Sequence, residues 1–272
     1  MCRALKVAES SFRHWRTRRG QPDRRIRANE AEVRKAVKRL HRQGRGSYGR
    51  PRLLARLREE GYAIGGNRLR RIMLEMGLSG RSGRKRHKRE TVEQTKTPPA
   101  PNLLKREFIV DAPNKVWTGD ITEFRVGQAK LYLAVVIDLF SRTVVGWMIA
   151  DHMRCVLVID AMKNAVRRRK PVAYLIFHSD QGAQYKATRF TVMLRTLGIE
   201  QSMSRRGNCW DNAPTESFFA TLKKELVYTR SWASRAELEL AINKYIAYYN
   251  RRRLHTTLGL KSPRDYEHDH AA

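Results

Sequence analysis

Residues 116–150 decide the fold, and they read VWTGDITEFRVGQAKLYLAVVIDLFSRTVVGWMIA. The stretch holds three runs rich in β-branched and aromatic residues, at 116–126, 130–140 and 143–150. Two short breaks, Gly127-Gln128 and Ser141-Arg142, separate the runs. Runs of this composition joined by breaks this short predict three antiparallel strands connected as a meander.

Segments of helix length and strand length alternate after this meander. The expected elements are a helix at about 154–169, a strand at 173–177, a helix at 186–198, a strand at 200–204, and helices at 214–229 and 235–250. The order β-β-β-α-β-α-β predicts an α/β fold, in which helices cover the faces of a mixed sheet. In the last helix, Leu238, Ile242, Tyr245 and Tyr249 recur at helical spacing. Their stripe either covers the chain's own sheet or packs on a partner.

The chain before residue 79 has helical periodicity. Apolar residues recur every three or four positions at 29–43 and at 50–60, and a glycine-rich break follows at 61–66. We expect Asn67 to cap a third helix. Three short helices with a glycine-bearing turn predict a small, all-helical helix-turn-helix domain.

The third helix carries Arg68, Arg70 and Arg71. Arginine side chains at the start of such a helix are suited to phosphates or to guanine edges. These three arginines are therefore predicted to bind DNA. The alternative is a generic three-helix bundle with a charged face.

The formal net charge of the 272-residue chain is +30. Residues 1–100 hold 29 Lys or Arg against 9 Asp or Glu, and residues 101–272 hold 27 against 17. A charge this large repels itself without a counter-charge, so it favours a polyanionic partner, for which DNA is the expectation. A merely soluble basic surface is the alternative.

A basic and then proline-rich segment, residues 79–101, has almost no large apolar side chains. Such a segment cannot bury enough surface to fold by itself, so it is predicted to be a linker. We expect four parts: a helix-turn-helix region at 1–78, the linker at 79–101, a catalytic core at 102–230, and a C-terminal helical extension at 231–272.

Targeting signals and disulfides are not expected. No run of about 18 apolar residues would span a membrane, and the first residues lack the apolar stretch of a signal peptide. The three cysteines, Cys2, Cys155 and Cys209, are widely spaced and suggest neither a disulfide framework nor a zinc site. We expect a cytoplasmic protein with no membrane partner.

Three acidic residues occupy positions at which this layout could converge. Asp120 lies in the first strand, Asp180 follows the fourth strand, and Glu216 opens a helix, 35 residues after Asp180. Carboxylates are hard oxygen ligands for Mg²⁺, and a cluster of them without a cation would repel. Two divalent ions about 4 Å apart can activate an attacking hydroxyl and stabilise the leaving oxygen of a phosphodiester. These residues therefore predict a metal site.

The motifs around these residues are Trp117-Thr118-Gly119-Asp120-Ile121-Thr122, His178-Ser179-Asp180-Gln181-Gly182 and Asn212-Ala213-Pro214-Thr215-Glu216-Ser217-Phe218-Phe219. They resemble the integrase-type transposases of bacterial insertion sequences, within the retroviral-integrase-like DDE superfamily. The resemblance is greater to the second-reading-frame (OrfB) protein of the IS-three family, and it covers nearly the whole chain. Tyr48-Gly49 resembles its helix-turn-helix segment. Tyr248-Tyr249-Asn250 with Arg251, Arg253, His255 and Leu258 resembles its C-terminal signature.

This resemblance implies an RNase H-like fold and a D-D-(35)-E triad formed by Asp120, Asp180 and Glu216, both catalytic and metal-binding. It further implies two Mg²⁺ or Mn²⁺ ions, nicking at the DNA 3′ end, and strand transfer. The implied partners are element-end DNA, target DNA and an upstream-frame (OrfA-type) protein, joined by fusion or association. The implied location is the bacterial cytoplasm, at the nucleoid.

Two further residues are candidates for DNA contact. Lys223 lies seven residues, two helical turns, after Glu216, so both face one side of a helix. A lysine there could hold a DNA phosphate, as the family pattern also implies; Lys224 is the competing candidate. Asn212 in the preceding loop either contacts substrate or caps the helix. The roles of Asn208 and His255 are left open.

Other polar residues are interpreted as structural. Glu123 should point away from Asp120 in a strand, Asp138 is expected at a turn or sheet edge, and His178 near a strand end is expected to support the fold.

Three functions remain in competition: a transposase, a non-catalytic DNA-binding regulator, and a simple RNase H-type nuclease. The intact triad with Lys223 favours an enzyme, and the basic helix-turn-helix arm favours a transposase over a nuclease. Because element ends must be paired, we expect a homo-oligomer, at least a dimer.

Overall fold

The structure is a computed structural model that describes residues 29–81, 99–104, 109–171, 174–204 and 212–270. It divides into two compact units, Met1–Gly80 and Arg81–Ala272. Most of the predicted linker and residues 1–28 lie outside the described residues. No helix in the described part is long and apolar enough to cross a membrane.

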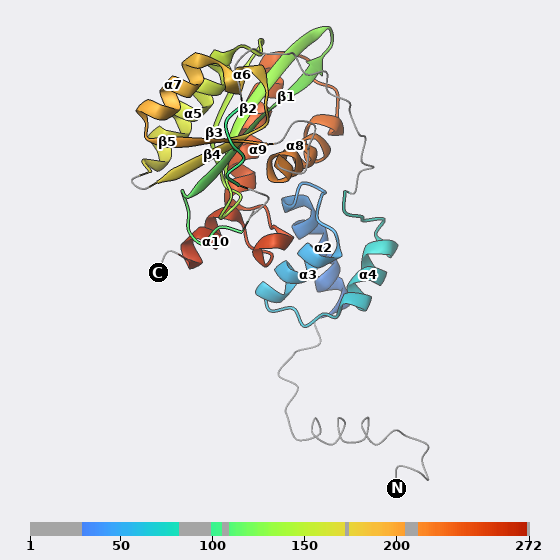
Figure 1. The fold of residues 1–272 in the computed structure, drawn as a ribbon. Coiled ribbons are helices and arrows are strands. Elements are labelled where there is room, and N and C mark those ends of the chain that lie inside the picture. The colour runs from blue at the N-terminus through green and yellow to red at the C-terminus, as the bar shows by residue number, and fades with distance from the viewer. Residues whose placement is uncertain (1–28, 82–98, 105–108, 172–173, 205–211, 271–272) are drawn as a thin grey trace. The chain divides into compact units, whose positions relative to one another are not determined.

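The described part of the first unit consists of helices α2 (Glu30–Gln43), α3 (Arg50–Glu59) and α4 (Gly66–Glu75) (Figure 1). Asn29 caps α2, since its side-chain oxygen accepts a hydrogen bond from the Ala31 amide. The core is formed by the apolar stripe of each helix, in which these side chains are fully buried: Val33, Val37, Leu53, Leu57, Leu69 and Ile72. The predicted three-helix arrangement is confirmed.

The predicted cap of α4 is wrong. The cap is Gly65, in an extended conformation with φ −87° and ψ 154°, and Asn67 lies inside the first helical turn. Glycine is acceptable at this position because a helix cap needs a non-helical backbone. The consequence is that the exposed Asn67 side chain lies on the helix surface and does not close the helix end.

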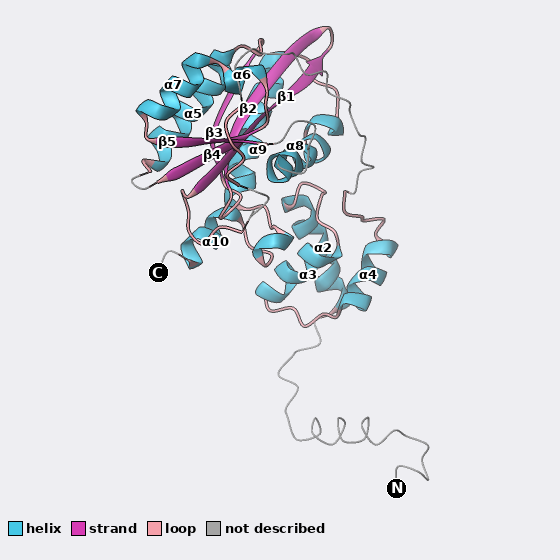
Figure 2. Cartoon of the chain, viewed as in Figure 1, coloured by secondary structure: helices cyan, strands magenta, loops and turns pink. Residues whose placement is uncertain are grey.

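The second unit is built on a five-stranded sheet with the strand order β3-β2-β1-β4-β5 (Figure 2). The strands are β1 (Val116–Val126), β2 (Ala129–Asp138), β3 (Val144–Ala150), β4 (Leu175–Ser179) and β5 (Ile199–Met203). The first three strands pair antiparallel, as the meander predicted, while β4 runs parallel to β1 and β5 runs parallel to β4. The predicted mixed sheet is confirmed.

Helices cover both faces of this sheet (Figure 1). One face packs against α5 (Cys155–Arg169), α6 (Ala183–Lys186) and α7 (Thr188–Thr196). The other packs against α8 (Ala213–Glu225) and α9 (Arg235–Arg251). The 3₁₀ turns η2 (Val227–Thr229) and η3 (Thr256–Leu258) and the helix α10 (Pro263–Asp269) complete the unit.

The alternation along β1 determines which side chains share the face with α8. Trp117 belongs to the cluster beneath α5 and α7, whereas Phe124 belongs to the cluster beneath α8 and α9. Because successive strand residues point to opposite faces, Asp120 lies on the same face as Phe124. The sheet thus presents Asp120 toward the side that carries α8.

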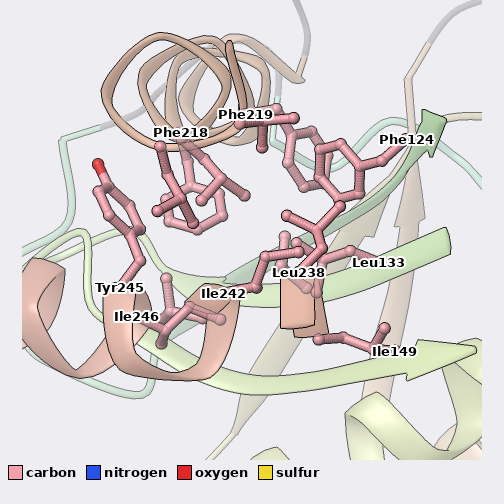
Figure 3. Packing of buried hydrophobic residues seen from close by; sticks show 14 of the residues in the cluster. Phe124, Leu133, Ile149, Phe218, Phe219, Leu238, Ile242, Tyr245 and Ile246 are labelled. Atoms are coloured by element: carbon pink, nitrogen blue, oxygen red, sulfur yellow. The ribbon is translucent and has the colours of Figure 1, made fainter. Parts of the chain in front are cut away.

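The stripe on α9 covers the chain's own sheet. Leu238, Ile242 and Tyr245 are fully buried against Phe218 and the strands (Figure 3). Each such side chain stabilises the fold by about 1.5–3 kcal/mol relative to exposure. The alternative interpretation, that this stripe packs on a partner, is therefore wrong, and the predicted C-terminal extension belongs to the core of the second unit.

The outer edge of β3 is occupied by side chains. The Asn250 side chain accepts a hydrogen bond from the Val144 amide and donates one to its carbonyl, both at 2.9 Å. The Asn164 amide donates to the Trp147 carbonyl at 3.2 Å. Beside them, the Arg168 guanidinium lies 3.8 Å from the centre of the Trp147 ring. The signature residue Asn250 thus has a structural task at a sheet edge.

Candidate active site and DNA-binding surface

The sheet brings Asp120 and Asp180 toward one another. Val116 of β1 pairs with Ile176 of β4, and Thr118 pairs with His178. The same offset, continued to the end of β4, sets Asp120 opposite Asp180. Neighbouring residues in a parallel register point to the same face, so the two half-buried carboxyl groups lie on one side of the sheet.

The surroundings of the two aspartates agree with this placement. The Asp180 carboxylate accepts a hydrogen bond from the Gly182 amide at 3.0 Å, and the Asp120 carboxylate accepts one from the Ile121 amide at 2.7 Å. Burial raises the pKa of the Tyr185 phenol well above its ordinary value, and the charges of Asp120 and Asp180 raise this pKa further. Both carboxylates therefore act on the same buried hydroxyl.

Two glycines make room for this geometry. In the turn after β4, a Cβ at Gly182 would lie 2.9 Å from the Asp180 Oδ1 atom, which is too close. A Cβ at Gly119 would lie 2.4 Å from the Phe177 ring, across the pair of strands that carry the two aspartates. A side chain at Gly119 would collide with this ring, which is buried in the core, so the position favours glycine.

The start of α8 is attached to β1 directly beside Asp120. The Asn212 amide donates to the Gly119 carbonyl at 3.2 Å, and the Thr215 hydroxyl donates to the Asn212 side-chain oxygen at 3.1 Å. The hydroxyls of Thr215 and Thr118 are 2.9 Å apart, and all of these groups are buried. These contacts hold the first turn of α8, which contains Glu216, next to the strand that carries Asp120.

Glu216 differs from the aspartates because its side chain is exposed in the first turn of α8. Within the described ranges, no three His, Cys, Asp or Glu side chains lie close enough to hold a metal ion. The segment 205–211, which leads into α8, lies outside those ranges. The structure thus brings together the two aspartates and positions the helix of Glu216, without gathering all three carboxylates into one cluster.

A divalent cation is chemically compatible with the aspartate pair. Two adjacent, half-buried carboxylates form a hard oxygen donor set with positions left for water and substrate phosphate, which suits Mg²⁺. The residues present therefore fit such an ion.

Lys223 lies two turns along α8 from Glu216, partly buried, with its ammonium 5.7 Å from the centre of the Phe124 ring. Phe124 follows Asp120 on the same face of β1, so Lys223 and the aspartate share one side of the sheet. The neighbouring Lys224 offers its backbone carbonyl to Arg81 at 3.3 Å. The two lysines are thus distinct in their surroundings.

The amide of Asn212 is used within the protein, because the side chain is only 5% exposed and both of its ends are hydrogen-bonded. This favours a structural role over substrate contact, in which the Asn212 side chain joins α8 to β1 and makes no cap hydrogen bond to the helix backbone. The neighbouring Asn208 lies outside the described residues.

The polar residues interpreted as structural are integrated into the fold. His178 is fully buried, and its Nδ1 lies 2.8 Å from the Ser202 hydroxyl. Glu123 forms an ion pair with Lys130 at 3.2 Å. Asp138 ends β2 at the turn that leads to β3, as expected, and it is fully buried there. Burial raises the pKa of its carboxyl, which accepts a hydrogen bond from the Asn114 amide at 2.8 Å.

The C-terminal signature supports the far end of α8. Arg253 donates from Nη2 to the Glu225 carboxylate at 2.8 Å, and Tyr245 donates to the same carboxylate at 2.8 Å. The side chains of Arg253 and Glu225 are 7% and 6% exposed. The His255 ring packs edge-on against Tyr249, with centroids 4.7 Å apart. Sequence reasoning missed the Glu225 partner, although an acidic residue at the end of α8 and a basic signature were visible.

The three arginines of α4 have different surroundings. Arg71 pairs with Glu30 at 2.8 Å and with Glu75 at 3.0 Å, and Arg68 lies 3.9 Å from Glu30. Arg70 is exposed and forms no ion pair with a described residue. Of the three arginines, only Arg70 thus forms no ion pair with a described acidic residue.

Comparison with known families identifies the parts of the chain. Residues 110–209 match an integrase core domain, residues 197–263 match a second integrase core domain model, and residues 28–86 match an HTH-like domain. The fold and the site thus define a polynucleotidyl transferase of the integrase type that carries a DNA-binding region.

Curated relatives extend this to the whole chain. The transposase for insertion sequence element IS904 of Lactococcus lactis is 40% identical over 85% of this chain and 91% of its own length. The putative transposase InsK for IS150 of Escherichia coli is 36% identical over 98% of this chain and 92% of its own length. Transposase InsF for IS3A of the same organism is 35% identical, covering 100% and 94%. The chain belongs to the IS3 family of insertion-sequence transposases, and it is a DDE transposase acting on DNA.

The fold also resembles a chain of the simian T-cell lymphotropic virus intasome in complex with the PP2A regulatory subunit B56 gamma. The match has a TM-score of 0.50 at 18% identity and covers 86% of this chain and 74% of that chain. The predicted RNase H-like class of the second unit is confirmed.

Proposed function

We propose that this transposase cuts the 3′ ends of its element and joins them to target DNA in one active site, formed by Asp120, Asp180 and Glu216. The observation that carries the proposal is the shared face of the two aspartates, beside which Asn212 and Thr215 hold the helix of Glu216. Chemistry on two successive phosphodiesters requires this kind of common site.

The three carboxylates would hold divalent metal, for which Mg²⁺ or Mn²⁺ fits the oxygen donors. When bound, two such ions supply charge stabilisation to the attacking and the leaving oxygen. The chain itself orients its carboxylates: the Gly182 and Ile121 amides hold the two aspartates, and the buried contacts of Asn212 hold α8. We assign Asn212 a positioning role rather than a DNA contact.

The reaction has two steps that balance without a covalent enzyme intermediate. Water attacks the phosphorus at the element end, the bond to the 3′ oxygen breaks, and that oxygen leaves as a 3′-hydroxyl. The 3′-hydroxyl then attacks a target phosphodiester, forms a new P–O bond, and displaces the target's own 3′ oxygen. Lys223 binds a DNA phosphate beside the carboxylates, and Arg68, Arg70 and Arg71 belong to the region that binds the element end.

Incubation of the full-length protein with labelled element-end duplexes, target plasmid and Mg²⁺ tests this proposal. The expected product is end DNA covalently joined to target. Cut but unjoined DNA would indicate an RNase H-type nuclease. Binding with neither product, in Mg²⁺ or Mn²⁺, would indicate a non-catalytic regulator.

We further propose that the active form is a homo-oligomer, at least a dimer, because two element ends must be coupled. Mixing an Asp180→Asn variant with a variant lacking residues 1–78 should recover joining that neither has alone. No recovery, with a monomeric mass on end DNA by light scattering, would contradict the proposal. An upstream-frame (OrfA-type) partner is part of the same proposal, and its addition should increase joining.

The division into 1–78, 79–101, 102–230 and 231–272 is likewise proposed. Limited proteolysis should cut first within 79–101. Because α9 contributes to the main core, residues 231–272 should stay with the 102–230 fragment.

A further inference from the structure

Helix α4 has one face in the core of its unit and one face in solvent. Leu69 and Ile72 are fully buried. Asn67, Arg70 and Leu74 are exposed, and they lie three, four and seven positions apart. Residues with this spacing form a single row along a helix, so the three side chains point the same way.

The row of Asn67, Arg70 and Leu74 forms no ion pair with a described residue, whereas the neighbouring arginines do. Arg71, next to the row, is held by Glu30 and Glu75, and Arg34 pairs with the same two glutamates. The hydrogen-bonded Glu30 and Glu75 side chains raise the pKa of the Arg71 guanidinium. Arg70 has no such carboxylate among the described residues, so its fork of donors remains directed outward.

Leu74 is the third member of the row, and it is unusual for a basic surface. Its side chain is 68% exposed, and among the exposed large apolar residues of the described chain only Ile109 and Tyr228 have higher values. Shallow hollows of about 260 and 450 Å³ lie on either side of it, and Arg70 lines both. An apolar group between hollows offers a contact surface for another apolar group.

We propose that α4 reads base edges in the major groove of the element-end DNA through Asn67, Arg70 and Leu74, while the glutamates withhold Arg71 from the bases. This inference rests on the proposed function, in which the first unit binds the element end. The occupant is duplex DNA because residues 29–80 hold thirteen Lys or Arg against five Asp or Glu.

The three side chains match three different bases. An asparagine amide pairs with the N6 and N7 edge of adenine, an arginine fork pairs with O6 and N7 of guanine, and an apolar side chain contacts the thymine methyl group. Asn67 and Leu74 are separated by two helical turns, about 10 Å along the axis. That span corresponds to about three base-pair steps of 3.4 Å, so the row addresses neighbouring bases.

The experiment uses the full-length protein and a pool of DNA duplexes with a randomised segment, from which bound sequences are selected. Selection is repeated with Arg70→Ala and with the matched control Arg71→Ala. We expect Arg70→Ala to lose the preference for one guanine, weakening binding of the selected duplex by roughly 5- to 100-fold. Arg71→Ala removes a charge from the same binding region, so it should lower the affinity for all duplexes alike and leave the preferred sequence unchanged.

Thymine contact is tested by replacing each thymine of the selected duplex, one at a time, with deoxyuridine, which removes only the methyl group. Wild-type protein should bind one of the deoxyuridine duplexes several-fold more weakly than the unmodified duplex. The Leu74→Ala variant should bind that deoxyuridine duplex and the unmodified duplex equally. Asn67→Ala should relax the preference for one adenine. Circular dichroism verifies that each variant keeps its helix content.

Equal losses for Arg70→Ala and Arg71→Ala, with an unchanged selected sequence for both, would overturn the inference. So would a Leu74→Ala variant that keeps the full thymine preference. A loss of self-association on Leu74→Ala, without any change in base preference, would assign this face to a protein partner instead. The joining assay separates the two proposals: wild-type protein that joins ends, but whose selected sequence ignores Arg70, refutes only the base-reading face.

Discussion

The two units of the molecule use arginine in opposite ways. In the first unit, Arg71 pairs with Glu30 at the surface, and their side chains are 53% and 38% exposed. In the second unit, Arg253 pairs with Glu225 in the interior, where both side chains are less than a tenth exposed. Exposed pairs contribute little stability and are screened by salt, whereas a buried pair is strongly destabilising to break.

The surface pairs of the first unit thus suit DNA recognition, and the buried pair of the second unit fixes the position of a helix. Surface pairs arrange cations that remain within reach of a polyanion, so the first unit stays responsive to DNA and to ionic strength. The buried pair holds the last residue of α8 to the chain segment after α9, while Asn212 and Thr215 hold its start to β1. The helix that carries Glu216 and Lys223 is therefore attached at both ends.

The largest effect, on the rate of DNA joining, is expected from substitutions of the two aspartates of the second unit. Asp120→Asn and Asp180→Asn each remove a ligand charge with little change of volume, so joining should fall below about a thousandth of the wild-type rate, since metal-ion stabilisation is worth several kcal/mol. Duplex binding through the first unit should remain within a few-fold. The joining assay and a filter-binding assay on the same preparations measure both, and substantial joining by either variant would remove that aspartate from the site.

The second largest effect is expected from breaking the buried pair, and it should be a loss of stability. Burial alone would lower the pKa of the Arg253 guanidinium, yet the Glu225 carboxylate raises this pKa. Arg253→Met leaves that carboxylate without its ion-pair partner, so the free energy of unfolding should fall by about 3–5 kcal/mol. Denaturant unfolding checks this, and the double variant Arg253→Met/Glu225→Leu should regain part of the loss. Equal losses in the single and double variants would contradict the buried-charge explanation.

A smaller effect is expected for the lysine on α8. Lys223→Ala should lower joining by about tenfold and reduce the slope of log affinity against log salt by about 1, because one phosphate contact is lost. The matched control, Lys224→Ala, changes the neighbouring lysine and should keep both values. Measurements from low to moderate salt decide between them, and a larger effect of Lys224→Ala would reverse the assignment.

The smallest effect is expected for the surface network of the first unit. The hydrogen bond between Glu30 and Arg71 lowers the pKa of the Glu30 carboxyl. The hydrogen bond between Glu75 and Arg34 lowers the pKa of the Glu75 carboxyl. Carboxyls with a lowered folded-state pKa stabilise the fold above their ordinary pKa, and this contribution is lost as the pH falls through the lowered value. Arg71→Gln should therefore lower the melting temperature slightly at neutral pH and low salt, and not at acid pH or in 1 M salt. A difference that persists in 1 M salt would argue for a packing role.

Much of the fold could be predicted because it depends on local pattern. The β-branched runs of residues 116–150 gave the antiparallel meander, and the apolar stripes gave the helices of both units. The sequence analysis expected a helical extension at 231–272 but did not specify helix α10, although Ser262-Pro263 before Asp265 is a typical helix start, and Ser262 does cap α10. The prediction that Asn67 caps α4 was wrong because both glycine and asparagine are favourable at a cap position.

The candidate site was less accessible to sequence reasoning. The spacing of Asp120, Asp180 and Glu216 pointed to a common function, and the β1–β4 register supports the two aspartates as neighbours. The attachment of α8 could not be predicted, because the contacts of Thr118 with Thr215 and of Glu225 with Arg253 join distant segments. The catalytic role of the triad stays a prediction until it is measured.

The occupied edge of β3 has a consequence for how copies of the protein meet. A sheet with an open edge invites a strand from another molecule, and this is a common route to aggregation. Here Asn250 takes both backbone groups of Val144, and Asn164 takes the Trp147 carbonyl, so a visiting strand finds these positions filled. In the oligomer proposed above, this edge of the sheet is thereby protected from strand pairing between copies of the chain.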